Sequence, residues 1–346
     1  MKAISKPEAK AGFELIETPK PTPEKDEVLI KVSHASVCGT DFHITNWDAW
    51  SAARIKPPLI YGHEFCGVIE SVGKGVKNLK PGDYVSAEMH WFCGKCPQCT
   101  LGHFHICEKG KIYGVDANGC FADYVVLPAQ QIVKLPSEIP PEYGACLDSL
   151  GNAVHAVSKT DVKDQIVYVS GCGPIGLFAI AVSKAMGAKA VYASDISDYR
   201  LKLAKKAGAD HVLKADQLSV SQGLLAKTEQ HGVDVVLEMS GNPNAIHEAF
   251  SALKQAGVMV LMGIPKGPID LDINRHIIFK ESKVIGVNGR EIFGTWEMMI
   301  DLLSGQKGYQ KLDLDFIITH RLKLEQFGEA MDLIAQGKSG KIILEP

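Results

Sequence analysis

Short apolar runs separated by glycine and proline dominate the first 90 residues of the chain. Residues 27–32 and 65–72 have the composition of strands, and residues 80–85 read as a turn that leads into another strand. No long helical period interrupts these runs. The pattern predicts a small β-barrel or β-sandwich in this part of the chain.

From about residue 150 the pattern changes to strands that alternate with helices. Four apolar strands are expected, at 165–170, 190–194, 233–238 and 258–263. Three helices are expected between them, at 177–186, 198–208 and 243–255. This alternation predicts an α/β fold with a doubly wound parallel sheet.

The alternation stops beyond residue 288. Four further segments are expected: a helix near 294–304, a polar loop at 305–315, a strand at 317–320 and a helix near 324–336. One interpretation is that the parallel-sheet domain is inserted into the β-rich domain. The first domain would then hold residues 1–149 and 289–346, and the second residues 150–288.

Composition agrees with two soluble globular domains. The chain has 346 residues, 46% of them hydrophobic and 22% charged, and a domain takes about 150 residues. A net charge of −3 gives no general attraction to nucleic acid or to an anionic membrane. The start lacks an apolar export segment, and no run approaches the ~18 apolar residues that span a bilayer. We therefore expect a cytoplasmic protein.

Four of the nine cysteines form the most specific motif in the chain. Cys93, Cys96, Cys99 and Cys107 are separated by two, two and seven residues, a spacing that lets four thiolates build one tetrahedral cage. A disulfide framework is not expected in a chain without an export signal. Zinc and an iron–sulfur cluster both fit four thiolates. Four protein ligands leave no position for a substrate, so a zinc in this lobe, about residues 90–110, would be structural.

A second set of candidate ligands lies at residues 38–64. Cys38, His63 and Glu64 supply sulfur, nitrogen and oxygen, which would form an incomplete shell for a catalytic zinc. Thr40 and His43 would then be nearby proton carriers. Taken alone, these residue types are widely spaced and do not establish a metal site.

The strand at 165–170 runs directly into a glycine-rich turn. Gly171, Gly173 and Gly176 follow a G-x-G-x-x-G spacing, a helix begins there, and Asp195 ends the next strand 19 residues after Gly176. Strand, glycines, helix, strand and acid in this order predict a dinucleotide site with the pyrophosphate at the helix N-terminus. Asp195 favours the ribose diol of NAD over the 2'-phosphate of NADP. Arg200 could stack on adenine or be a solvated helix residue.

Together, Gly62-His63-Glu64, the four-cysteine lobe and the glycine-rich turn resemble the zinc-dependent medium-chain alcohol dehydrogenase family across essentially the whole chain. The resemblance implies a GroES-like catalytic domain and a Rossmann domain for NAD, with one catalytic zinc on Cys38, His63 and Glu64 and one structural zinc on the four cysteines. It implies a proton relay through Thr40 and His43. Asp148 would lie beside the catalytic metal as a ligand, behind the ligands or in the relay, and His90 near the substrate.

The same resemblance implies further cofactor contacts and an assembly state. The cofactor contacts would include Ile175, Met262, Gly263, Ile264, Val287 and Asn288 beside the residues already named. The protein would be a homotetramer with a small-molecule substrate and without nucleic acid or membrane partners.

Particular segments point to the family members that oxidise the 3-hydroxyl of L-threonine to 2-amino-3-oxobutanoate. They include residues 38–44, 46–50 with Trp47 and Trp50, 151–155, 289–291 with Arg290, and 317–321. The two tryptophans would pack from one helical face or cover the substrate, and Arg290 would bind a substrate carboxylate or a cofactor phosphate. One alternative is a dehydrogenase for polyols or vicinal diols, such as sorbitol or 2,3-butanediol. Another is a non-catalytic protein that senses NAD(H).

Overall fold

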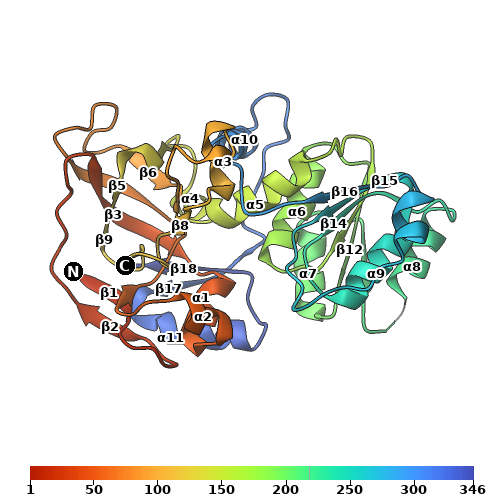
Figure 1. Ribbon diagram of the computed structural model, residues 1–346, viewed down its shortest axis with the longest axis horizontal. Coiled ribbons are helices and arrows are strands. Elements are labelled where there is room, and N and C mark those ends of the chain that lie inside the picture. Colours follow the sequence, from red (N-terminus) through yellow and green to blue (C-terminus); the bar gives the residue numbers. More distant parts are fainter. Residues whose placement is uncertain (218) are drawn as a thin grey trace. The chain divides into compact units, whose positions relative to one another are not determined.

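The computed structural model describes residues 1–217 and 219–346, which divide into two compact units. Met1–Asp148 and Ile318–Pro346 form the first unit, and Ser149–Ile317 form the second (Figure 1). The second unit is thus inserted into the first, and the earlier junction lies within one residue of the expected one. In the described parts of the chain, no helix is long and apolar enough to cross a bilayer.

The later junction differs from the expected 288/289, because residues 289–317 pack with the second unit. The Gly289 carbonyl accepts a hydrogen bond from His155 Nδ1 at 2.9 Å, and the Gln310 N–H donates to the Ala185 carbonyl. Helix α10, Gly294–Ser304, also buries Trp296 and Met299. These contacts lie within the second unit. The sequence pattern had suggested that the same residues belong to the first unit, because the alternation of strands and helices ends near residue 288.

The strands of the first unit are β1 Lys2–Lys6, β2 Glu14–Glu17, β3 Glu27–Ser36, β4 Leu59–Ile60, β5 Phe65–Val72, β6 Tyr84–Ala87, β7 His90–Trp91, β8 Lys111–Ile112, β9 Tyr124–Pro128, β10 Ile132–Lys134, β17 Ile318–Lys323 and β18 Lys341–Glu345. Its helices are α1 Gly39–Asn46, α2 Ala49–Arg54, α3 Pro97–Thr100, α4 Pro141–Gly144 and α11 Phe327–Ala335, with the 3₁₀ turns η1 Phe104–Ile106, η2 Ala129–Gln131 and η4 Leu324–Gln326. Helix α5, Leu147–Ser158, crosses the junction between the units.

A seven-stranded sheet organises the first unit. Its order is β10-β6-β5-β3-β18-β17, with β9 also paired to β3. At the end of β3, Ala35 lies opposite Phe65 of β5, and Ser36 lies opposite Ile343 of β18. This register brings the residues that follow β3, precede β5 and begin β18 to one place. The core beneath includes Ile30, Val32, Ile69, Val85, Leu127 and Phe327.

The strands of the second unit are β11 Ile166–Ser170, β12 Ala190–Asp195, β13 His211–Lys214, β14 Val233–Glu238, β15 Leu253–Leu261 and β16 Lys283–Gly286. Its remaining helices are α6 Pro174–Ala185, α7 Asp198–Lys206, α8 Val220–Lys227, α9 Pro243–Ala252, the π-turn η3 Asn274–Ile278 and α10.

These six strands form one parallel sheet in the order β13-β12-β11-β14-β15-β16. Ser170, Ser194, Glu238 and Leu261 share register across it, so the carboxyl ends of β11, β12, β14 and β15 meet at one edge. Ligands bind at this edge of a doubly wound sheet. The predicted fold class, a β-rich GroES-like unit with a doubly wound parallel sheet, is confirmed.

Element boundaries differ where local chemistry overrides the hydrophobic pattern. Helix α6 begins three residues earlier than expected, because Pro174 suits the first helical position after Gly173. Helix α9 stops at Ala252 instead of 255, because Lys280 Nζ donates to the carbonyls of Phe250 and Leu253 at its end. Ala256 with φ +56° then lies in a conformation that no helix contains.

Candidate metal centres and dinucleotide pocket

The first candidate metal centre lies where β3, β5 and β18 meet. One ligand atom each from Cys38, His63 and Glu64 lie within 4.8 Å of one another. Cys38 follows β3 and caps the N-terminus of α1, whereas His63 and Glu64 lead into β5. The structure therefore brings together the three residues that the sequence left widely spaced.

Asp41 supports this cluster from behind. Its carboxylate is fully buried and accepts a hydrogen bond from the Cys38 backbone N–H at 2.9 Å. Its other oxygen lies 3.8 Å from His63 Nδ1, which leaves Nε2 for a metal. At 3.8 Å the two atoms do not form a hydrogen bond, so the carboxylate acts on the ring through its charge. The sequence showed Asp41 only as one more acidic residue in the segment.

The electrostatics of the cluster suit a cation. Burial alone would lower the pKa of His63, but the Asp41 carboxylate and the Cys38 side chain raise it to about 10. Asp148, at the start of α5, also raises the pKa of His63, so it lies close enough to act on this ring. A site that favours a protonated imidazole in spite of full burial stabilises positive charge. Sulfur, nitrogen and oxygen donors in such a site fit zinc.

Glu64 has a buried partner that the sequence did not indicate. Its Oε2 accepts hydrogen bonds from Ser36 Oγ at 2.7 Å and from Lys341 Nζ, and both Glu64 and Lys341 are almost completely buried. Burial would lower the pKa of Lys341, but the Glu64 carboxylate raises it above its usual range. Lys341 begins β18, 277 residues after Glu64. Only the strand register connects them.

Thr40 and His43 lie on α1, which starts at the metal cluster. They are three positions apart and so share a helical face, with Thr40 Oγ1 3.8 Å from Cys38 Sγ. His43 is exposed, and its Nδ1 lies 2.6 Å from Asp48 Oδ2. This arrangement extends from the metal cluster toward solvent, as a proton relay requires.

Two other predicted residues have local partners. His90 is half-buried at the start of β7, and its Nδ1 lies 2.9 Å from Glu88 Oε1. Arg290 is buried in the second unit, with its guanidinium 5.8 Å from the centre of the Trp296 ring. The predicted roles of both residues at the substrate or cofactor stay predictions.

The expected packing of Trp47 and Trp50 on one helical face is wrong. Trp47 ends α1 with φ +54°, and Trp50 lies in the next helix, α2. Trp47 packs against the core of the first unit, with Lys6 Nζ 4.9 Å from its ring. Trp50 is 41% exposed. The left-handed turn at Trp47 separates two helices that a spacing of three residues suggested were one.

The four-cysteine lobe forms the second candidate metal centre. One sulfur from each of Cys93, Cys96, Cys99 and Cys107 lies within 4.8 Å of the others. Backbone N–H groups point at these sulfurs, such as Cys96 N at 3.3 Å from Cys93 Sγ, and such a contact from Cys99 lowers the pKa of Cys96 to about 6. Hydrogen bonds of this kind stabilise thiolates, the form that binds metal. The donor set fits a closed zinc site.

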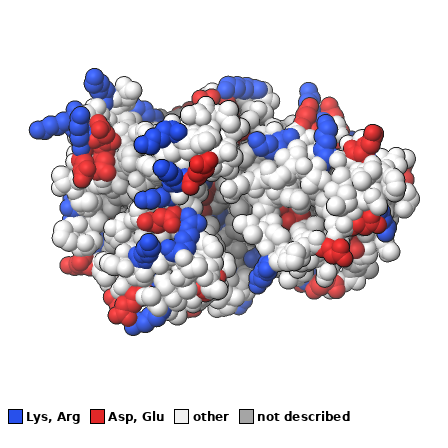
Figure 2. All heavy atoms as spheres, viewed as in Figure 1, with Lys and Arg blue, Asp and Glu red and all other residues white. Residues whose placement is uncertain are grey.

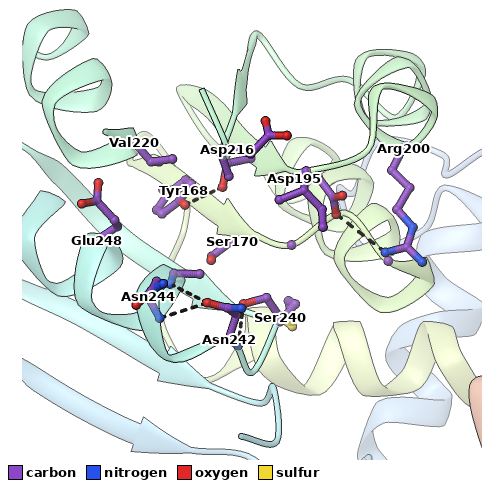
Figure 3. Close-up of a pocket in the computed structure, with 17 residues that line it drawn as sticks. Tyr168, Ser170, Asp195, Arg200, Asp216, Val220, Ser240, Asn242, Asn244 and Glu248 are labelled. Carbon is purple, nitrogen blue, oxygen red and sulfur yellow. Dashed lines mark hydrogen bonds and ion pairs between the residues drawn. The ribbon is translucent and has the colours of Figure 1, made fainter. Parts of the chain in front are cut away.

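A cavity of about 540 Å³ opens at the carboxyl edge of the parallel sheet (Figure 3). Gly171, Gly173, Asp195 and Arg200, four of the residues predicted to bind the dinucleotide, line this cavity. Gly171 has φ +92°, and a Cβ on Gly176 would lie 2.0 Å from the Gly171 carbonyl oxygen, so this tight turn excludes side chains. Asp195 accepts backbone hydrogen bonds from Cys172 and Ser197 at 2.8 Å, and Arg200 lies 3.9 Å from its carboxylate.

The remaining predicted cofactor residues lie near the same edge or after it. Ile175 is the second residue of α6, Met262, Gly263 and Ile264 follow β15, and Val287 and Asn288 follow β16. A Cβ on Gly263 would lie 2.2 Å from Gly241 N, so the loops after β14 and β15 touch there. None of these six is among the residues that line the cavity of the described structure.

Several other residues that line this cavity were not predicted from the sequence. Tyr168, Asn242, Asn244 and Glu248 line it (Figure 3), and Asn242 accepts the N–H groups that begin α9. Asn242 follows β14, so the rule that ligands bind at carboxyl ends could have identified it. Tyr168 lies within β11, where the apolar pattern hides it.

Comparison with known proteins agrees with this geometry. Residues 24–137 match the model of the alcohol dehydrogenase GroES-like domain, and residues 174–305 match that of the zinc-binding dehydrogenases. The L-threonine 3-dehydrogenase of Pyrococcus abyssi is 45% identical over 344 residues, which cover 99% of this chain and 98% of that protein. The chain belongs to the zinc-binding dehydrogenase family.

Solved structures show that this zinc-binding dehydrogenase has the family's whole fold. Galactitol-1-phosphate dehydrogenase from Escherichia coli superimposes with a TM-score of 0.90 at 30% identity and covers 100% of both chains. The 2R,3R-butanediol dehydrogenase from Bacillus subtilis gives a TM-score of 0.88 at 27% identity over 100% of this chain and 99% of that one.

Acidic and basic side chains are mixed on the visible face of the protein (Figure 2).

Proposed function

We propose that this protein oxidises the 3-hydroxyl of L-threonine to 2-amino-3-oxobutanoate, with NAD⁺ as the hydride acceptor. One observation carries the proposal. Cys38, His63 and Glu64 form a three-ligand cluster, and the same chain has a cavity suited to a dinucleotide, with Asp195 in its lining. Full-length similarity to enzymes named L-threonine 3-dehydrogenase, at 42–45% identity, supports the substrate.

The two metal clusters take different roles in this proposal. Cys93, Cys96, Cys99 and Cys107 hold a structural zinc, because four sulfurs close its shell. Cys38, His63 and Glu64 hold a catalytic zinc, because three protein ligands leave a position for the substrate hydroxyl. Asp148 acts on this site from beside His63.

Removal of the proton from the substrate hydroxyl is the energetically costly step. An aliphatic hydroxyl with a pKa near ~15.7 lies about nine units above a histidine at ~6.5, a gap of roughly 12 kcal/mol that His43 alone does not close. A zinc ion held by Cys38, His63 and Glu64 would lower the pKa of a coordinated hydroxyl, as it lowers that of water to about 7. Thr40 then passes the proton to His43, whose exposed ring releases it to water.

The second unit binds and orients the cofactor. Gly171 and Gly173 would hold the pyrophosphate at the start of α6, because free N–H groups and the helix dipole attract anions there. The Asp195 carboxylate would accept hydrogen bonds from the ribose hydroxyls and repel a 2'-phosphate, so NAD is favoured over NADP. Bound NAD⁺ would accept the hydride from the carbon that carries the hydroxyl.

A second candidate function is the same chemistry on a polyol or a vicinal diol. The similarity of fold to galactitol-1-phosphate and 2R,3R-butanediol dehydrogenases favours it. A non-catalytic NAD(H)-sensing protein is the third candidate. Its weakness is that a pure binder has no use for an open metal cluster with an adjacent proton relay.

One assay separates the three candidates. The initial rate of NADH formation is measured with L-threonine, sorbitol and 2,3-butanediol, before chelation, after chelation and after zinc is restored. We expect the highest kcat/KM with L-threonine, and loss and recovery of this activity with zinc. A preference for a diol would overturn the assignment of L-threonine as the substrate. No turnover in the zinc-loaded protein would favour the non-catalytic NAD(H)-sensing protein.

The proposal includes an assembly state and a location. We expect a cytoplasmic homotetramer, as the family resemblance implies. Sedimentation equilibrium of the purified protein tests the tetramer, because a mass of one or two chains would contradict it.

A further inference from the structure

In the part of the chain that the structure describes, the side chain of His43 pairs with the carboxylate of Asp48. Nδ1 of His43 lies 2.6 Å from Asp48 Oδ2. His43 belongs to α1, whereas Asp48 lies in the turn between α1 and α2. The left-handed conformation of Trp47, φ +54°, reverses the chain between them and brings the carboxylate back to the ring.

Asp48 is itself held in place. Its Oδ1 accepts the backbone N–H of Ser51 at 2.9 Å, so it is the N-cap residue of α2. This backbone hydrogen bond, followed by the contact with His43, lowers the pKa of Asp48. The carboxylate is therefore ionised at neutral pH and can only accept hydrogen bonds. One oxygen is committed to the helix and the other is free to orient the ring.

An ionised acceptor at Nδ1 determines the tautomer of a neutral His43. Nδ1 must carry the hydrogen that the carboxylate accepts, so the lone pair lies on Nε2. A relay that takes a proton from the substrate side needs this free lone pair. The side chains of His43 and Asp48 are 59% and 38% exposed, so the far end of the relay opens to water.

We propose that Asp48 is a positioning residue for the proton relay, which holds His43 in the tautomer whose Nε2 accepts the proton from Thr40. This inference rests on the proposed role of His43 in substrate oxidation. It gives the segment between the two tryptophans a function in proton transfer, in addition to the packing of Trp47. The carboxylate does not touch the substrate, and it acts only through the ring of His43.

Asp48→Asn tests the proposal with little change to the fold, because asparagine caps helices as well as aspartate does. Its Oδ1 still accepts the Ser51 N–H, and its amide N–H₂ then faces Nδ1 of His43. A donor at this position favours the opposite tautomer, with the hydrogen on Nε2. A similar loss of the correct tautomer is known to impair a catalytic triad severely.

Asp116→Asn is the matched control. Asp116 forms a two-point ion pair with Arg54 of α2, at 2.9 and 2.7 Å, and its removal loosens the same helix without touching His43. The first readout is the ¹⁵N chemical shifts of the His43 ring at a pH where it is neutral, assigned with His43→Gln. The second is kcat with L-threonine, with and without added imidazole.

We expect Asp48→Asn to move the hydrogen of His43 from Nδ1 to Nε2 and to lower kcat by about 10- to 100-fold, partly restored by imidazole, with KM changed by less than about threefold. Asp116→Asn should change neither the ring shifts nor kcat. An unchanged His43 tautomer in Asp48→Asn, or a kcat equal to that of Asp116→Asn, would overturn the inference. If the wild-type protein does not oxidise threonine, the proposed function and the relay role of Asp48 both fail, whereas unchanged ring shifts in an active Asp48→Asn protein would overturn the role of Asp48 alone.

Discussion

Lys341 and Glu64 form an ion pair in the interior of the first unit, where the Lys341 side chain is 1% exposed and the Glu64 side chain is fully buried. Lys341 Nζ also donates to the Val37 carbonyl at 3.1 Å, and Ser36 Oγ shares the Glu64 carboxylate. The pair therefore ties the start of β18 to the end of β3 and to a candidate zinc ligand. A buried pair of this kind is far more sensitive to the loss of one partner than a surface pair.

Lys341→Met should destabilise the protein strongly, because Glu64 would keep a buried charge without its counter-ion. We expect a loss of about 3–5 kcal/mol in the free energy of unfolding, measured by urea denaturation of the chelated, zinc-free protein, because a zinc ion bound to Glu64 would neutralise the carboxylate in place of Lys341. Lys323→Met is the control, since its partner Glu345 is at the surface and such pairs contribute about 1 kcal/mol or less. If Lys341→Met were no worse than the control, the buried charge would have another counter-ion.

Substitutions of the glycines in the turn after β11 should separate an effect on NAD affinity from an effect on stability. Gly173→Ala should weaken NAD binding without lowering stability, because Gly173 has an ordinary φ of −66° and a Cβ would meet no protein atom within 4 Å. In the proposed function, the pyrophosphate of NAD would occupy this space. Gly171→Ala should impair both NAD binding and folding, because φ is +92° and its Cβ would lie 2.9 Å from Ser240.

Calorimetric titration with NAD and a thermal melt measure these two effects. We expect the Kd for NAD to rise by at least about tenfold in both variants, which corresponds to about 1.4 kcal/mol. The melting temperature should fall only for Gly171→Ala. A Gly173→Ala protein with unchanged NAD affinity would show that the pyrophosphate binds elsewhere.

The two metal clusters should lose zinc with different consequences. Cys38→Ala should remove one zinc per subunit and abolish turnover, while the melting temperature changes little. Cys99→Ala should also remove one zinc, but it should lower the melting temperature because a closed structural site contributes to folding. Zinc is counted by elemental analysis of each purified variant. Equal thermal destabilisation by both substitutions would contradict the division into catalytic and structural sites.

Acid should weaken the ion pair of Glu142 and Arg321, which joins α4 to β17. Arg321 forms a two-point contact with Glu142, at 2.6 and 2.7 Å, and lowers the pKa of that carboxyl. A carboxyl with a lowered folded-state pKa adds stability above its unfolded value of about 4.5 and loses that stability as the pH falls through the folded value. Glu142→Gln should thus be less stable than wild type at neutral pH, and the difference should shrink as the pH falls below the unfolded value and vanish below the lowered folded-state value.

Urea titrations at several pH values measure this difference. Arg321→Met serves as the matched variant, since it removes the same pair from the other side and should show the same pH dependence. The double variant should be no less stable than the worse single one at neutral pH. A difference between wild type and Glu142→Gln that stayed constant with pH would contradict the assignment.

Much of the fold follows from local patterns in the sequence. Strand β5 begins and ends where predicted, at Phe65 and Val72, because β-branched residues between glycines define it. The glycine turn and Asp195 were predictable because the close approach of a helix to a strand restricts residue type. The four cysteines were predictable because their spacing is short enough for a single lobe to bring them together.

The rest depends on contacts that no local pattern records. Lys341 and Asp41 acquire their roles from strand register and burial, and a lone lysine or aspartate in the sequence indicates neither. Helix α5 was not predicted, although its apolar residues recur at helical spacing, so the sequence held a signal for it. Residues 289–317 pack with the second unit instead of the expected first unit, and the hydrogen bonds to His155 and Ala185 that hold them there leave no periodic pattern in the sequence.

The position of β18 has a consequence for how the protein is made. Cys38, His63 and Glu64 emerge from the ribosome early, but Lys341 follows Glu64 only after 277 further residues, a stretch that includes the entire second unit. Until β18 is synthesised, the Glu64 carboxylate has no lysine to neutralise it, and β3 lacks one of its neighbours in the sheet. The candidate metal site of Cys38, His63 and Glu64 therefore acquires its buried counter-ion only after β18 has been synthesised.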